Sequence, residues 1–401
     1  MTASHIGSNP RVVKEADALA AAGFDVCVIA QRMSDEVEMR DQSVLSTARW
    51  RCVRVDLRAK TKRRAYRIAQ MAASKISDAS PRFAARAIGV GAPLLAKAAI
   101  KEKADLYIAH YPAALPGAAA AAHAHHGRYA YDAEDFHAGE WPDEPKYERN
   151  RALVRAVEAR YLPACAYVTA AAPAIAEAYV QSYNIFPDVV LNVFPLARAS
   201  EQARPAGAPE NAPSVYWFSQ VIGPDRGLEC AVRATGRAKT RPKLFLRGHI
   251  SRDYRDRLLE IAAECSAQER VHFLPSVAPD MLEKLAADYD VGLCCEPGKT
   301  HNNDILLSNK LFTYLCGGVA PVLSATRGQT AFARENGLGE YLYPPDDSAA
   351  LAAVLDRLFE EPAELARARA HALNLARQRY NWEAQSQKII SLAQAAVALR
   401  G

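Results

Sequence analysis

The sequence contains no apolar stretch that approaches the roughly 18 residues of a membrane-spanning helix. It also contains no Cys-x-x-Cys pair, the spacing that is typical of zinc ligands. Its eight cysteines are scattered, and the adjacent Cys294 and Cys295 are poorly placed for a disulfide. These absences argue against a membrane-spanning, zinc-binding or disulfide-rich class, and they predict a reducing, cytoplasmic compartment.

The composition is that of a globular chain large enough for more than one domain. Of the 401 residues, 50% are hydrophobic and 24% are charged, and the formal net charge is +5. A chain of this length usually divides into two or three domains, each with its own core. The net charge is mild, so its distribution along the chain is more informative than its total.

The first half alternates helical and strand patterns. A polar loop at 5–11 leads into helical spacing over 12–22, Gly23 ends that helix, and 26–30 follows as an all-apolar strand. Further strands are expected at 105–109, 129–131, 166–170 and 189–193, and helices at 114–125, 146–162 and 173–183. This alternation predicts a parallel, doubly wound sheet. Only Met1-Thr2-Ala3 precede the loop, so we expect the first strand to lie upstream or to be absent from the sheet.

Polar side chains follow two of these strands. His110 follows 105–109, and Asp132, Glu134, Asp135 and His137 follow 129–131. The carboxyl ends of parallel strands border the crevice in which such sheets bind ligands, so these groups are candidates for acid/base or hydrogen-bonding roles. A metal site and a solvated acidic loop are the alternatives, and an Asp-x-Glu-Asp spacing does not by itself specify a metal.

A basic segment spans residues 49–67 and contains only one acidic residue, Asp56. Apolar residues Ile68, Met71, Ala72 and Ile76 follow at helical spacing. A basic cluster beside an amphipathic stretch favours an anionic membrane surface as partner. The segment lacks the regularly interleaved aromatic residues on which nucleic acid bases stack, so we expect no nucleic acid partner. The alternative is a solvated charged loop and helix.

The second half repeats the alternation after a linker, 197–213, that is rich in Ala, Pro, Gly, Glu and Arg. Strands are expected at 214–218, 243–246, 271–274, 291–295 and 320–324, and helices at 228–238, 253–264, 279–287, 327–336, 348–359 and 362–379. A final helix over 383–399 is long enough to reach back to the first half.

Two stretches of this half suit a phosphate group. The loop from Ser219 to Gly227 places Arg226 and backbone N–H groups at a helix start, although it lacks a Gly-x-Gly-x-x-Gly pattern. In Asp304–Gly318, Ser308 and Asn309 begin a second helix, Lys310 adds a positive charge, and Gly317-Gly318 end it. A simple N-cap with a solvated lysine is the alternative for this second stretch.

Several motifs together resemble the retaining family 4 of the GT-B glycosyltransferases. They are Ser8–Ala16 with Gly23, Tyr131-Asp132, Asn192-Val193, Asp225–Gly227, and Asn309–Leu315 with Gly318. The resemblance extends over nearly the whole chain. It implies two Rossmann-like doubly wound domains facing a central cleft, with a C-terminal helix crossing back to the first. The implied parts are an acceptor-binding domain (1–196), the linker (197–213), a nucleotide-sugar-binding domain (214–380) and the crossover helix (381–401).

The resemblance also implies roles for individual residues. The donor diphosphate would meet Arg226, with Lys310 replacing a cation that the family has ahead of it, where this chain has Ser219-Gln220. Two family glutamates fall on Ile305 and Thr313 here, and Asp304 and Asn303 are the nearest polar residues. Glu134 stands where the family often has His, so Glu134 or Asp135 would face the donor. The implied catalytic residues are Glu134, Asp135, Arg226 and Lys310; the donor-binding residues are Ser219, Gly223, Arg226, Gly227, His249, Asp304, Ser308, Asn309, Lys310 and Thr313; the acceptor-binding residues are Gly7, Ser8, Asn9, His110 and His137; no metal site is implied.

The implied activity is transfer of a sugar, with retention, from a UDP- or GDP-linked donor to a glycan or lipid-linked acceptor. The nucleotide-sugar would be a substrate, and no permanently bound cofactor is expected. The leaving phosphate would itself accept the proton of the acceptor. The expected setting is cell-surface polysaccharide or glycolipid synthesis at the inner face of the membrane. The alternatives are a nucleotide-sugar epimerase of the same fold and a degenerate GT-B protein that binds partners without catalysis.

Overall fold

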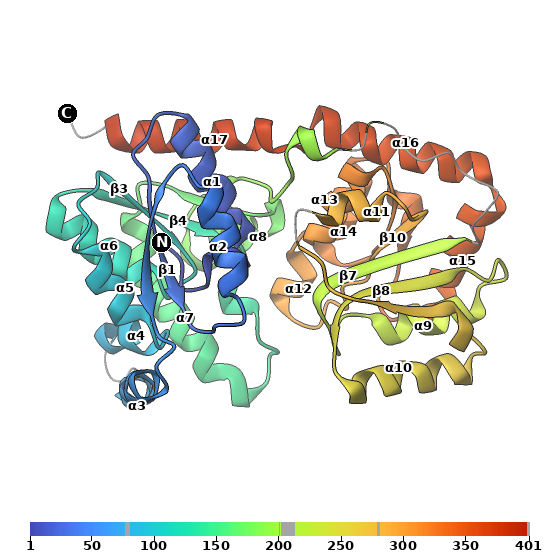
Figure 1. Ribbon diagram of the computed structural model, residues 1–401, viewed down its shortest axis with the longest axis horizontal. Coiled ribbons are helices and arrows are strands. Elements are labelled where there is room, and N and C mark those ends of the chain that lie inside the picture. The colour runs from blue at the N-terminus through green and yellow to red at the C-terminus, as the bar shows by residue number, and fades with distance from the viewer. Residues whose placement is uncertain (77–80, 200, 202–212, 279–280, 399–401) are drawn as a thin grey trace. The chain divides into compact units, whose positions relative to one another are not determined.

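The computed structural model describes residues 1–76, 81–199, 201, 213–278 and 281–398. The chain forms two compact units (Figure 1): unit 1 contains Met1–Leu191 with Ser386–Gly401, and unit 2 contains Asn192–Gln385. Each unit is built on parallel strands, so the predicted α/β class is confirmed. Most of the predicted linker, 197–213, lies outside the described residues. None of the described helices combines the length and apolar character needed to cross a bilayer.

The larger sheet of unit 1 is parallel, with the strand order β3-β4-β5-β6. Its strands are β3 (Leu106–His110), β4 (Arg128–Ala133), β5 (Val168–Ala170) and β6 (Asp188–Val189). The helices of this unit are α1 (Pro10–Ala21), α2 (Glu38–Thr47), α3 (Lys60–Ile76), α4 (Pro81–Ala87), α5 (Ala92–Ala99), α6 (Leu115–His125), α7 (Glu148–Tyr161) and α8 (Pro173–Tyr183). The strand expected at 189–193 is shorter than predicted because the chain leaves unit 1 after Leu191.

A separate parallel pair, β1 (Cys27–Arg32) and β2 (Arg51–Asp56), extends this sheet through the first residues of the chain. The N–H of Thr2 donates to the carbonyl of Ile29 at 2.9 Å, and the N–H of His110 donates to the carbonyl of Met1 at 2.8 Å. Thr2 also forms an isolated parallel bridge with His110. Residues 1–4 therefore lie between β1 and β3 and take the place of the strand that the sequence nearly lacks.

Strand β2 was not expected, because charged residues are interspersed among its few apolar residues and no strand pattern stands out in the sequence. It lies inside the basic segment 49–67, which the sequence suggested to be a loop followed by a helix. All its residues are half-buried or exposed, and it pairs only with β1 among the described strands. Edge strands commonly carry charged residues that discourage pairing with other chains. The same segment continues into α3, as expected.

Unit 2 contains a six-stranded parallel sheet in the order β12-β11-β10-β7-β8-β9. The strands are β7 (Ser214–Ile222), β8 (Lys243–Ile250), β9 (Val271–Leu274), β10 (Val291–Cys294), β11 (Ala320–Ser324) and β12 (Leu342–Tyr343). The helices are α9 (Leu228–Arg237), α10 (Arg252–Glu264), α11 (Leu282–Ala286), α12 (His301–Ile305), α13 (Asn309–Gly317), α14 (Arg327–Glu335), α15 (Ser348–Glu360) and α16 (Pro362–Gln378). Helix α17 (Trp382–Ala398) begins in unit 2, and its residues from Ser386 onward belong to unit 1. Helices α9 and α10 lie on one side of this sheet, and α13 and α16 lie on the other (Figure 1).

Helix α13 is fixed to the sheet by an aromatic side chain and a glycine. Tyr314 is fully buried, and its hydroxyl lies 3.1 Å from the carbonyl oxygen of Tyr216 and 3.2 Å from that of Leu293. A Cβ on Gly292 of β10 would lie 2.4 Å from the Tyr314 ring, so only glycine leaves room for it. Gly318 follows the helix with φ of 63°, which confirms that this glycine pair ends α13. The start of α13 is therefore held at the carboxyl edge of the sheet.

Candidate active site

The carboxyl end of β4 in unit 1 holds a buried ion pair. Arg11 of α1 donates through Nε and Nη2 to the two oxygens of Asp132, at 2.6 and 2.7 Å. Both side chains are 1% exposed. Thr169 of β5 adds a hydroxyl donor at 2.5 Å. Burial alone would raise the pKa of Asp132, but Arg11 and His110 hold it well below its usual value.

His110, at the end of β3, lies against this pair and is enclosed by carboxylates. Its Nδ1 lies 3.1 Å from Asp132 and 3.3 Å from Glu134, and its Nε2 lies 3.2 Å from Glu15 of α1. Burial by itself would lower the pKa of His110, but Glu15 and the other carboxylates raise it well above its usual value. The ring is 3% exposed and both its nitrogens are engaged. Helix α1 covers the ring through Glu15, and the contact of His110 with the acceptor stays a prediction.

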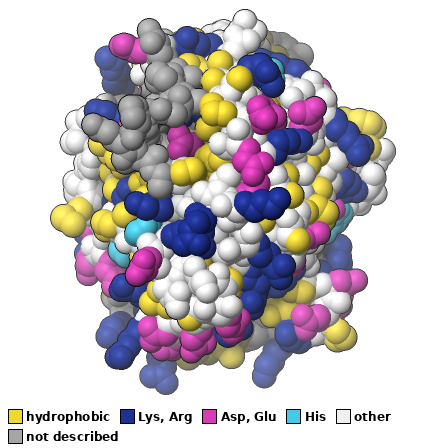
Figure 2. Space-filling model, turned by 90° about the vertical axis from the view of Figure 1, so that its right-hand side faces the viewer, with side chains coloured by type: hydrophobic (Ala, Val, Ile, Leu, Met, Phe, Trp, Pro, Cys, Tyr) yellow, Lys and Arg dark blue, Asp and Glu magenta, His cyan; other side chains and the backbone are white. Residues whose placement is uncertain are grey.

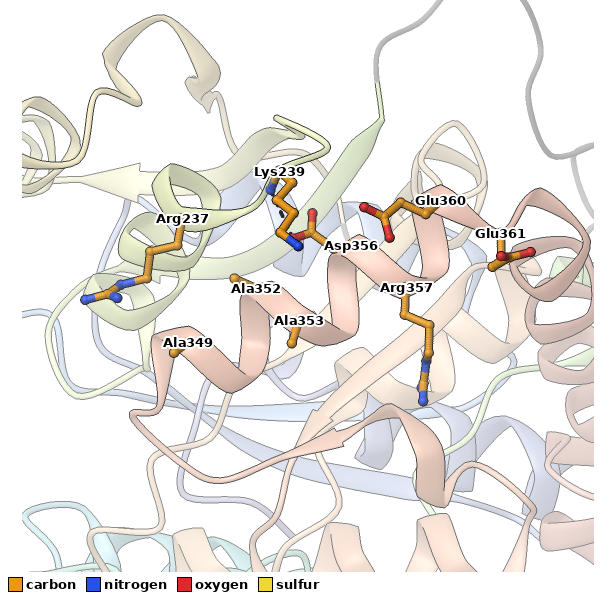
Figure 3. A pocket seen from close by; sticks show the side chains of 9 residues that line it. All are labelled: Arg237, Lys239, Ala349, Ala352, Ala353, Asp356, Arg357, Glu360 and Glu361. Carbon is orange, nitrogen blue, oxygen red and sulfur yellow. Dashed lines mark hydrogen bonds between the residues drawn. The ribbon is translucent and has the colours of Figure 1, made fainter.

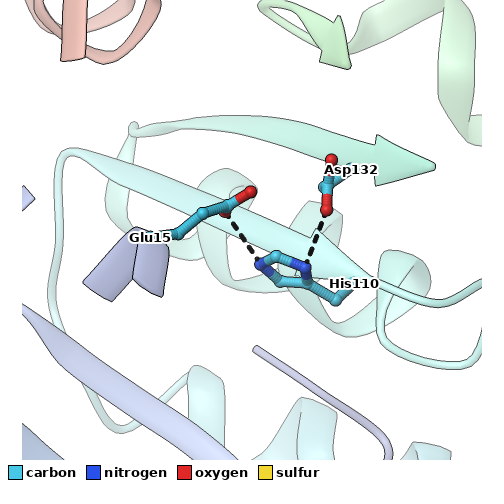
Figure 4. Close-up of side chains that lie close together, drawn as sticks. All are labelled: Glu15, His110 and Asp132. Carbon is cyan, nitrogen blue, oxygen red and sulfur yellow. Dashed lines mark ion pairs between the residues drawn. The ribbon is translucent and has the colours of Figure 1, made fainter. Parts of the chain in front are cut away.

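Glu15, His110 and Asp132 bring three potential metal-ligand atoms within 4.8 Å of one another. Figure 4 shows, however, that the two carboxylates approach opposite edges of the imidazole ring. Histidine binds one metal ion through one of its nitrogens, so an ion bound at either nitrogen would have only one of these carboxylates beside it. The guanidinium of Arg11 already occupies both oxygens of Asp132. The geometry fits a hydrogen-bonded charge cluster and not a chelate.

Glu134 is the member of this cluster that reaches the surface. Its side chain is 14% exposed, whereas those of Asp132 and His110 are 1% and 3% exposed. Its Oε1 accepts a hydrogen bond from Asn9 Nδ2 at 2.8 Å and lies within reach of His110. Asn9 in turn caps α1, because its Oδ1 accepts from the N–H of Val12 at 3.2 Å. The carboxylate of Glu134 is thus held in one orientation at the edge of the sheet.

The predicted acceptor loop is rigid. The N–H of Gly7 donates to Asp41 at 2.8 Å, and a Cβ on Gly7 would lie 2.8 Å from the backbone of Arg40. His5 Nε2 accepts from two backbone N–H groups, those of Met33 and Ser34, so its Nδ1 carries the proton that faces Asp41. Ser8 is half-buried in the same loop. Of the predicted acceptor residues, Gly7 and Asn9 are engaged with the protein, and a ligand role for Ser8 stays a prediction.

In unit 2, β7 extends to Ile222, past the predicted end at 218, so Ser219 lies in the strand. The loop 223–227 then joins β7 to α9 at the carboxyl edge of the sheet. Arg226 donates to the hydroxyl of Ser219 at 3.3 Å, which is a neutral partner. Gly227 has φ of 70°, and a Cβ there would lie 2.3 Å from the carbonyl oxygen of Cys295. Glycine is therefore required for the loop to pass against β10 and begin α9. Gly223, by contrast, has room, because an added Cβ would meet only Val221 at 3.7 Å.

Lys310, on the first turn of α13, is paired within unit 2. Its Nζ lies 2.8 Å from Glu296 and 3.0 Å from the hydroxyl of Ser308, and 5.5 Å from the centre of the Trp217 ring. Burial alone would lower the pKa of Lys310, but Glu296 raises it, and Lys310 in turn lowers the pKa of Glu296. Asn303 also donates to Glu296 at 3.1 Å. Glu296 and Ser308 hold the ammonium group of Lys310 in place, and the carboxylate of Glu296 balances its charge.

The other predicted donor residues differ in how they are used. Ser308 caps α13, and Asn309 accepts from Asn192 at 2.9 Å. Asp304 accepts from the N–H of Arg327 at 2.9 Å and so caps α14. Thr313 is fully buried and donates to the carbonyl of Asn309, and its contact with the donor stays a prediction. Its position on the core face of α13 explains this burial.

His249 lies exposed at the end of β8, with Nε2 2.8 Å from the hydroxyl of Ser276. It shares the carboxyl edge of the sheet with Ser219 and Glu296, because β8, β7 and β10 are neighbours. A different hollow of unit 2, about 510 Å³ in volume, lies between α9 and α15 and is lined by Arg237, Lys239, Asp356 and Glu360, among others (Figure 3). Those residues lie away from the strand ends, so this hollow is distinct from the candidate donor site.

Arg11, Glu15 and Glu296 received no role from the sequence, although the structure gives each a central one. Arg11 and Glu15 lie four residues apart on the buried face of α1, a spacing that could have marked them as a pair facing one partner. Glu296 directly follows a buried strand. Its partner Lys310 is 14 residues further along, a separation that no local pattern connects.

Comparison with known proteins agrees with this architecture. Residues 7–197 match the family described as glycosyl transferase 4-like domain. HepE from Anabaena, solved with UDP and glucose, aligns with a TM-score of 0.71 and 16% identity, covering 98% of both chains. Sucrose-phosphate synthase from Thermosynechococcus elongatus aligns with a TM-score of 0.70 and 17% identity, covering 99% of this chain and 95% of the other. No protein of curated function matches the sequence.

A glycosyltransferase from Rickettsia africae also aligns over 100% of this chain and 97% of its own, with a TM-score of 0.66 and 14% identity. At these identities the structural matches establish the fold, and the family match establishes the kind of domain in unit 1. The predicted GT-B fold is confirmed. The chain carries a glycosyl transferase 4-like domain over residues 7–197 and has the GT-B glycosyltransferase fold over its whole length.

Proposed function

We propose that this protein transfers a sugar from a nucleoside diphosphate sugar, bound to unit 2, to a glycan or lipid-linked acceptor, bound to unit 1. The observation that carries the proposal is the glycosyl transferase 4-like domain of residues 7–197. It is supported by the polar groups that gather at the carboxyl edge of the second sheet. HepE, which shares the fold, was solved with UDP-glucose, and a UDP- or GDP-linked sugar is the donor that we propose here.

The donor diphosphate would lie against Arg226 and the start of α9. Arg226 has a neutral side-chain partner, Ser219, whereas Lys310 is paired with Glu296. The first turns of α9 and α13 present backbone N–H groups that favour an anion. These groups would stabilise the negative charge that develops on the leaving nucleotide. Arg226 is therefore the main cation of the proposed site, and Lys310 contributes through the position of its ammonium group.

Glu134 would face the donor sugar from unit 1. Glycosyl transfer passes through a transition state with positive charge on the sugar ring, and a carboxylate stabilises that charge. Asn9 and His110 hold the carboxylate of Glu134, which supports such a role. The acceptor oxygen would bond to the anomeric carbon on the same face from which the phosphate oxygen departs, so the configuration is retained. The proton of the acceptor would pass to an oxygen of that leaving phosphate. Asp135, its neighbour, is half-buried and is the second candidate for this position.

The setting that we propose is cell-surface polysaccharide or glycolipid synthesis at the inner face of a membrane. On the face shown in Figure 2, basic and acidic side chains are interspersed. The sequence of α3, in contrast, contains no acidic residue, and its Arg63, Arg64 and Arg67 are exposed. Ile68 and Met71 on the same helix are 60% and 58% exposed. Basic and apolar side chains together on one exposed helix suit an anionic lipid surface.

A panel of UDP-, GDP- and ADP-sugars tests the donor. We expect one of them to raise the thermal midpoint and to be slowly hydrolysed, and Arg226→Ala to weaken its binding about tenfold to a hundredfold, because charge-assisted hydrogen bonds to phosphate are lost. Arg237→Ala, at the far end of α9, is the matched control. Absence of binding for every nucleotide would refute the proposal. Turnover of the sugar-nucleotide to an epimer without any acceptor would instead indicate an epimerase.

Sedimentation with liposomes tests the membrane. We expect binding to anionic vesicles that weakens as salt rises, and loss of that binding when Arg63, Arg64 and Arg67 are changed to Glu, because each basic residue contributes about 1 kcal/mol near such a surface. Charge reversal of Arg252, Arg255 and Arg257 on α10 provides a control of equal charge. Equal binding by both triple variants would contradict the proposed role of α3.

A further inference from the structure

Unit 1 contains a cavity of about 450 Å³ to which the proposed function assigns no role. It lies where the ends of β1 and β3, the segment after β4 and helix α7 come together. Its walls include Met33, Ile88, Tyr111, His137, Trp141 and Val154. A cavity of this size, with mostly apolar walls and few polar groups, has the character of a small-molecule site.

The polar group of most interest in this wall is His137. Its Nδ1 lies 2.6 Å from Glu140, while its Nε2, on the opposite edge of the ring, has no hydrogen-bond partner among the described residues. The side chain is 3% exposed. Burial alone would lower the pKa of His137, but Glu140 raises it to about 9, so the ring is an imidazolium and Nε2 carries a proton. A buried N–H without an acceptor is costly, and a ligand oxygen would satisfy it.

Two aromatic side chains stand beside this donor. The Tyr111 ring lies 5.4 Å from that of His137, and Tyr111 has φ of 70°, which is unusual for a residue other than glycine. Such backbone conformations are concentrated at binding and catalytic sites, where surrounding contacts hold them. Trp141, the residue after Glu140, is half-buried in the same wall. Aromatic faces next to a hydrogen-bonding pair suit a ring that has both an apolar face and hydroxyl groups.

The charges around the cavity favour a neutral ligand. The positive charge of His137 is balanced by Glu140, and Asp135 and Glu158 add further negative potential at the ring. An anionic ligand would therefore meet net repulsion, whereas one hydroxyl of a neutral ligand can accept from Nε2 and another can donate to a carboxylate. Glu140 is 36% exposed, so its carboxylate is accessible. The apolar wall made by Ile88 and Val154 leaves space for a hydrocarbon portion of the same ligand.

We propose that this cavity binds the acceptor as a neutral glycoside, with one sugar hydroxyl at Nε2 of His137, another at the carboxylate of Glu140, and an apolar aglycone along Ile88 and Val154. This inference rests on the proposed function, since it names the class of acceptor that unit 1 would take. It assigns His137 as the residue that recognises a hydroxyl of the acceptor. The side chains of Trp141 and Tyr111 would pack against the sugar ring.

Titration calorimetry of the full chain with octyl β-D-glucopyranoside, below its micelle concentration, tests the assignment. We expect binding, weakened about tenfold or more by His137→Phe, which keeps a ring and removes the N–H donor. Trp141→Ala, at a half-buried position, is a second variant that keeps the test decisive if His137→Phe unfolds. His123→Phe, on the exposed end of α6, is the matched control and should bind as the unchanged protein does.

Octyl phosphate and free glucose complete the comparison. We expect octyl phosphate to bind more weakly than the glucoside because of the surrounding carboxylates, and glucose to bind more weakly because it lacks the aglycone. Tighter binding of octyl phosphate, or equal affinity of the His137→Phe and unchanged proteins, would overturn the proposal. If the glucoside binds through His137 and no nucleotide-sugar binds, the cavity assignment stands and the proposed transferase function fails. If nucleotide-sugars turn over and the glucoside does not bind, the reverse holds.

Discussion

The carboxyl edges of the two sheets use charge in different ways. In unit 1, Arg11, Asp132 and His110 are each between 1% and 3% exposed and pair with one another, although Nη1 of Arg11 has no hydrogen-bond partner among the described residues. In unit 2, Lys310 and Glu296 are 11% and 13% exposed, and Arg226 is half-buried with a neutral partner. The first arrangement is closed to solvent, whereas the second stays within reach of a ligand.

This difference separates positioning from binding. Buried charges are costly unless every partner is present, so the cluster of unit 1 fixes α1, β3 and β4 relative to one another and orients Glu134. The cations of unit 2 lie close enough to water to exchange a protein partner for a phosphate. Substitutions in the buried cluster of unit 1 should therefore lower stability, whereas substitutions of the cations of unit 2 should lower ligand affinity.

The largest expected effect is on the buried cluster. Arg11→Met leaves Asp132 without its bidentate partner, and we expect unit 1 to lose about 3–5 kcal/mol of stability because an uncompensated charge stays buried. Hydrogen exchange detected by mass spectrometry can follow unfolding of unit 1 peptides separately. Arg51→Met, which breaks an exposed pair with Glu102, should cost far less stability because solvent screens that pair. Equal losses for the two variants would show that the cluster is not a special feature of unit 1.

A smaller effect follows from the pair His137 and Glu140. The folded pKa of His137, about 9, lies above its ordinary value of 6.5, so the pair stabilises the fold fully below about pH 6.5. That contribution is lost as the pH rises from about 6.5 through 9. Because Glu140 is partly solvated, we expect a loss of about 2 kcal/mol, measured as a fall in the denaturation midpoint of unit 1. Glu140→Gln should flatten this pH dependence, and an unchanged profile would contradict it.

The two glycines of the donor loop offer a matched comparison within unit 2. Gly227→Ala places a Cβ 2.3 Å from the Cys295 carbonyl at positive φ, so we expect about 1–3 kcal/mol of destabilisation together with weaker nucleotide binding. Gly223→Ala has space and should change stability by less than about 0.5 kcal/mol. Thermal midpoints with and without nucleotide measure both. Similar effects of the two substitutions would mean that the passage of the loop against β10 does not position the site.

The smallest expected effect on stability concerns the partly exposed ion pair of Lys310 and Glu296. Lys310→Met leaves Glu296 with Asn303 as a partner, and we expect a stability loss of about 1 kcal/mol but a clear loss of nucleotide affinity. Glu296→Gln retains a hydrogen-bond acceptor for Lys310 while it removes the competing charge, so nucleotide binding should be kept or strengthened. A larger effect on stability than on binding would place this pair in the same class as the cluster of unit 1.

The sequence predicts the fold well because its strongest signals are local. All-apolar strands such as 26–30 and 320–324 and helix-ending glycines such as Gly318 depend only on neighbouring residues. Strand β2 escaped prediction because an edge strand tolerates charge at almost every position. Residues 1–4 could not be placed, because their strand-like role depends on hydrogen bonds to both β1 and β3.

The candidate site is less predictable, because its contacts are long-range. Arg11 and Asp132 are 121 positions apart, and no local sequence pattern in either segment predicts that the two side chains pair. Residue type placed His110 correctly at a strand end, but not its burial, which results from α1 packing over it. Thr313 was assigned because a family glutamate falls on its position, and Asp304 because it is a polar neighbour of the other such position. The structure uses Thr313 inside α13 and Asp304 to cap α14.

Helix α17 has a consequence for how the protein is made. Its first turn belongs to unit 2, and the residues from Ser386 onward belong to unit 1, where Lys388 donates to the carbonyl of Val189 and Ile389 is buried. Unit 1 is therefore interrupted in sequence by the whole of unit 2. On the ribosome, where chains fold from the N-terminus, unit 1 must wait for its last helix until unit 2 has been synthesised. Unit 2, whose residues are contiguous, can complete its fold first.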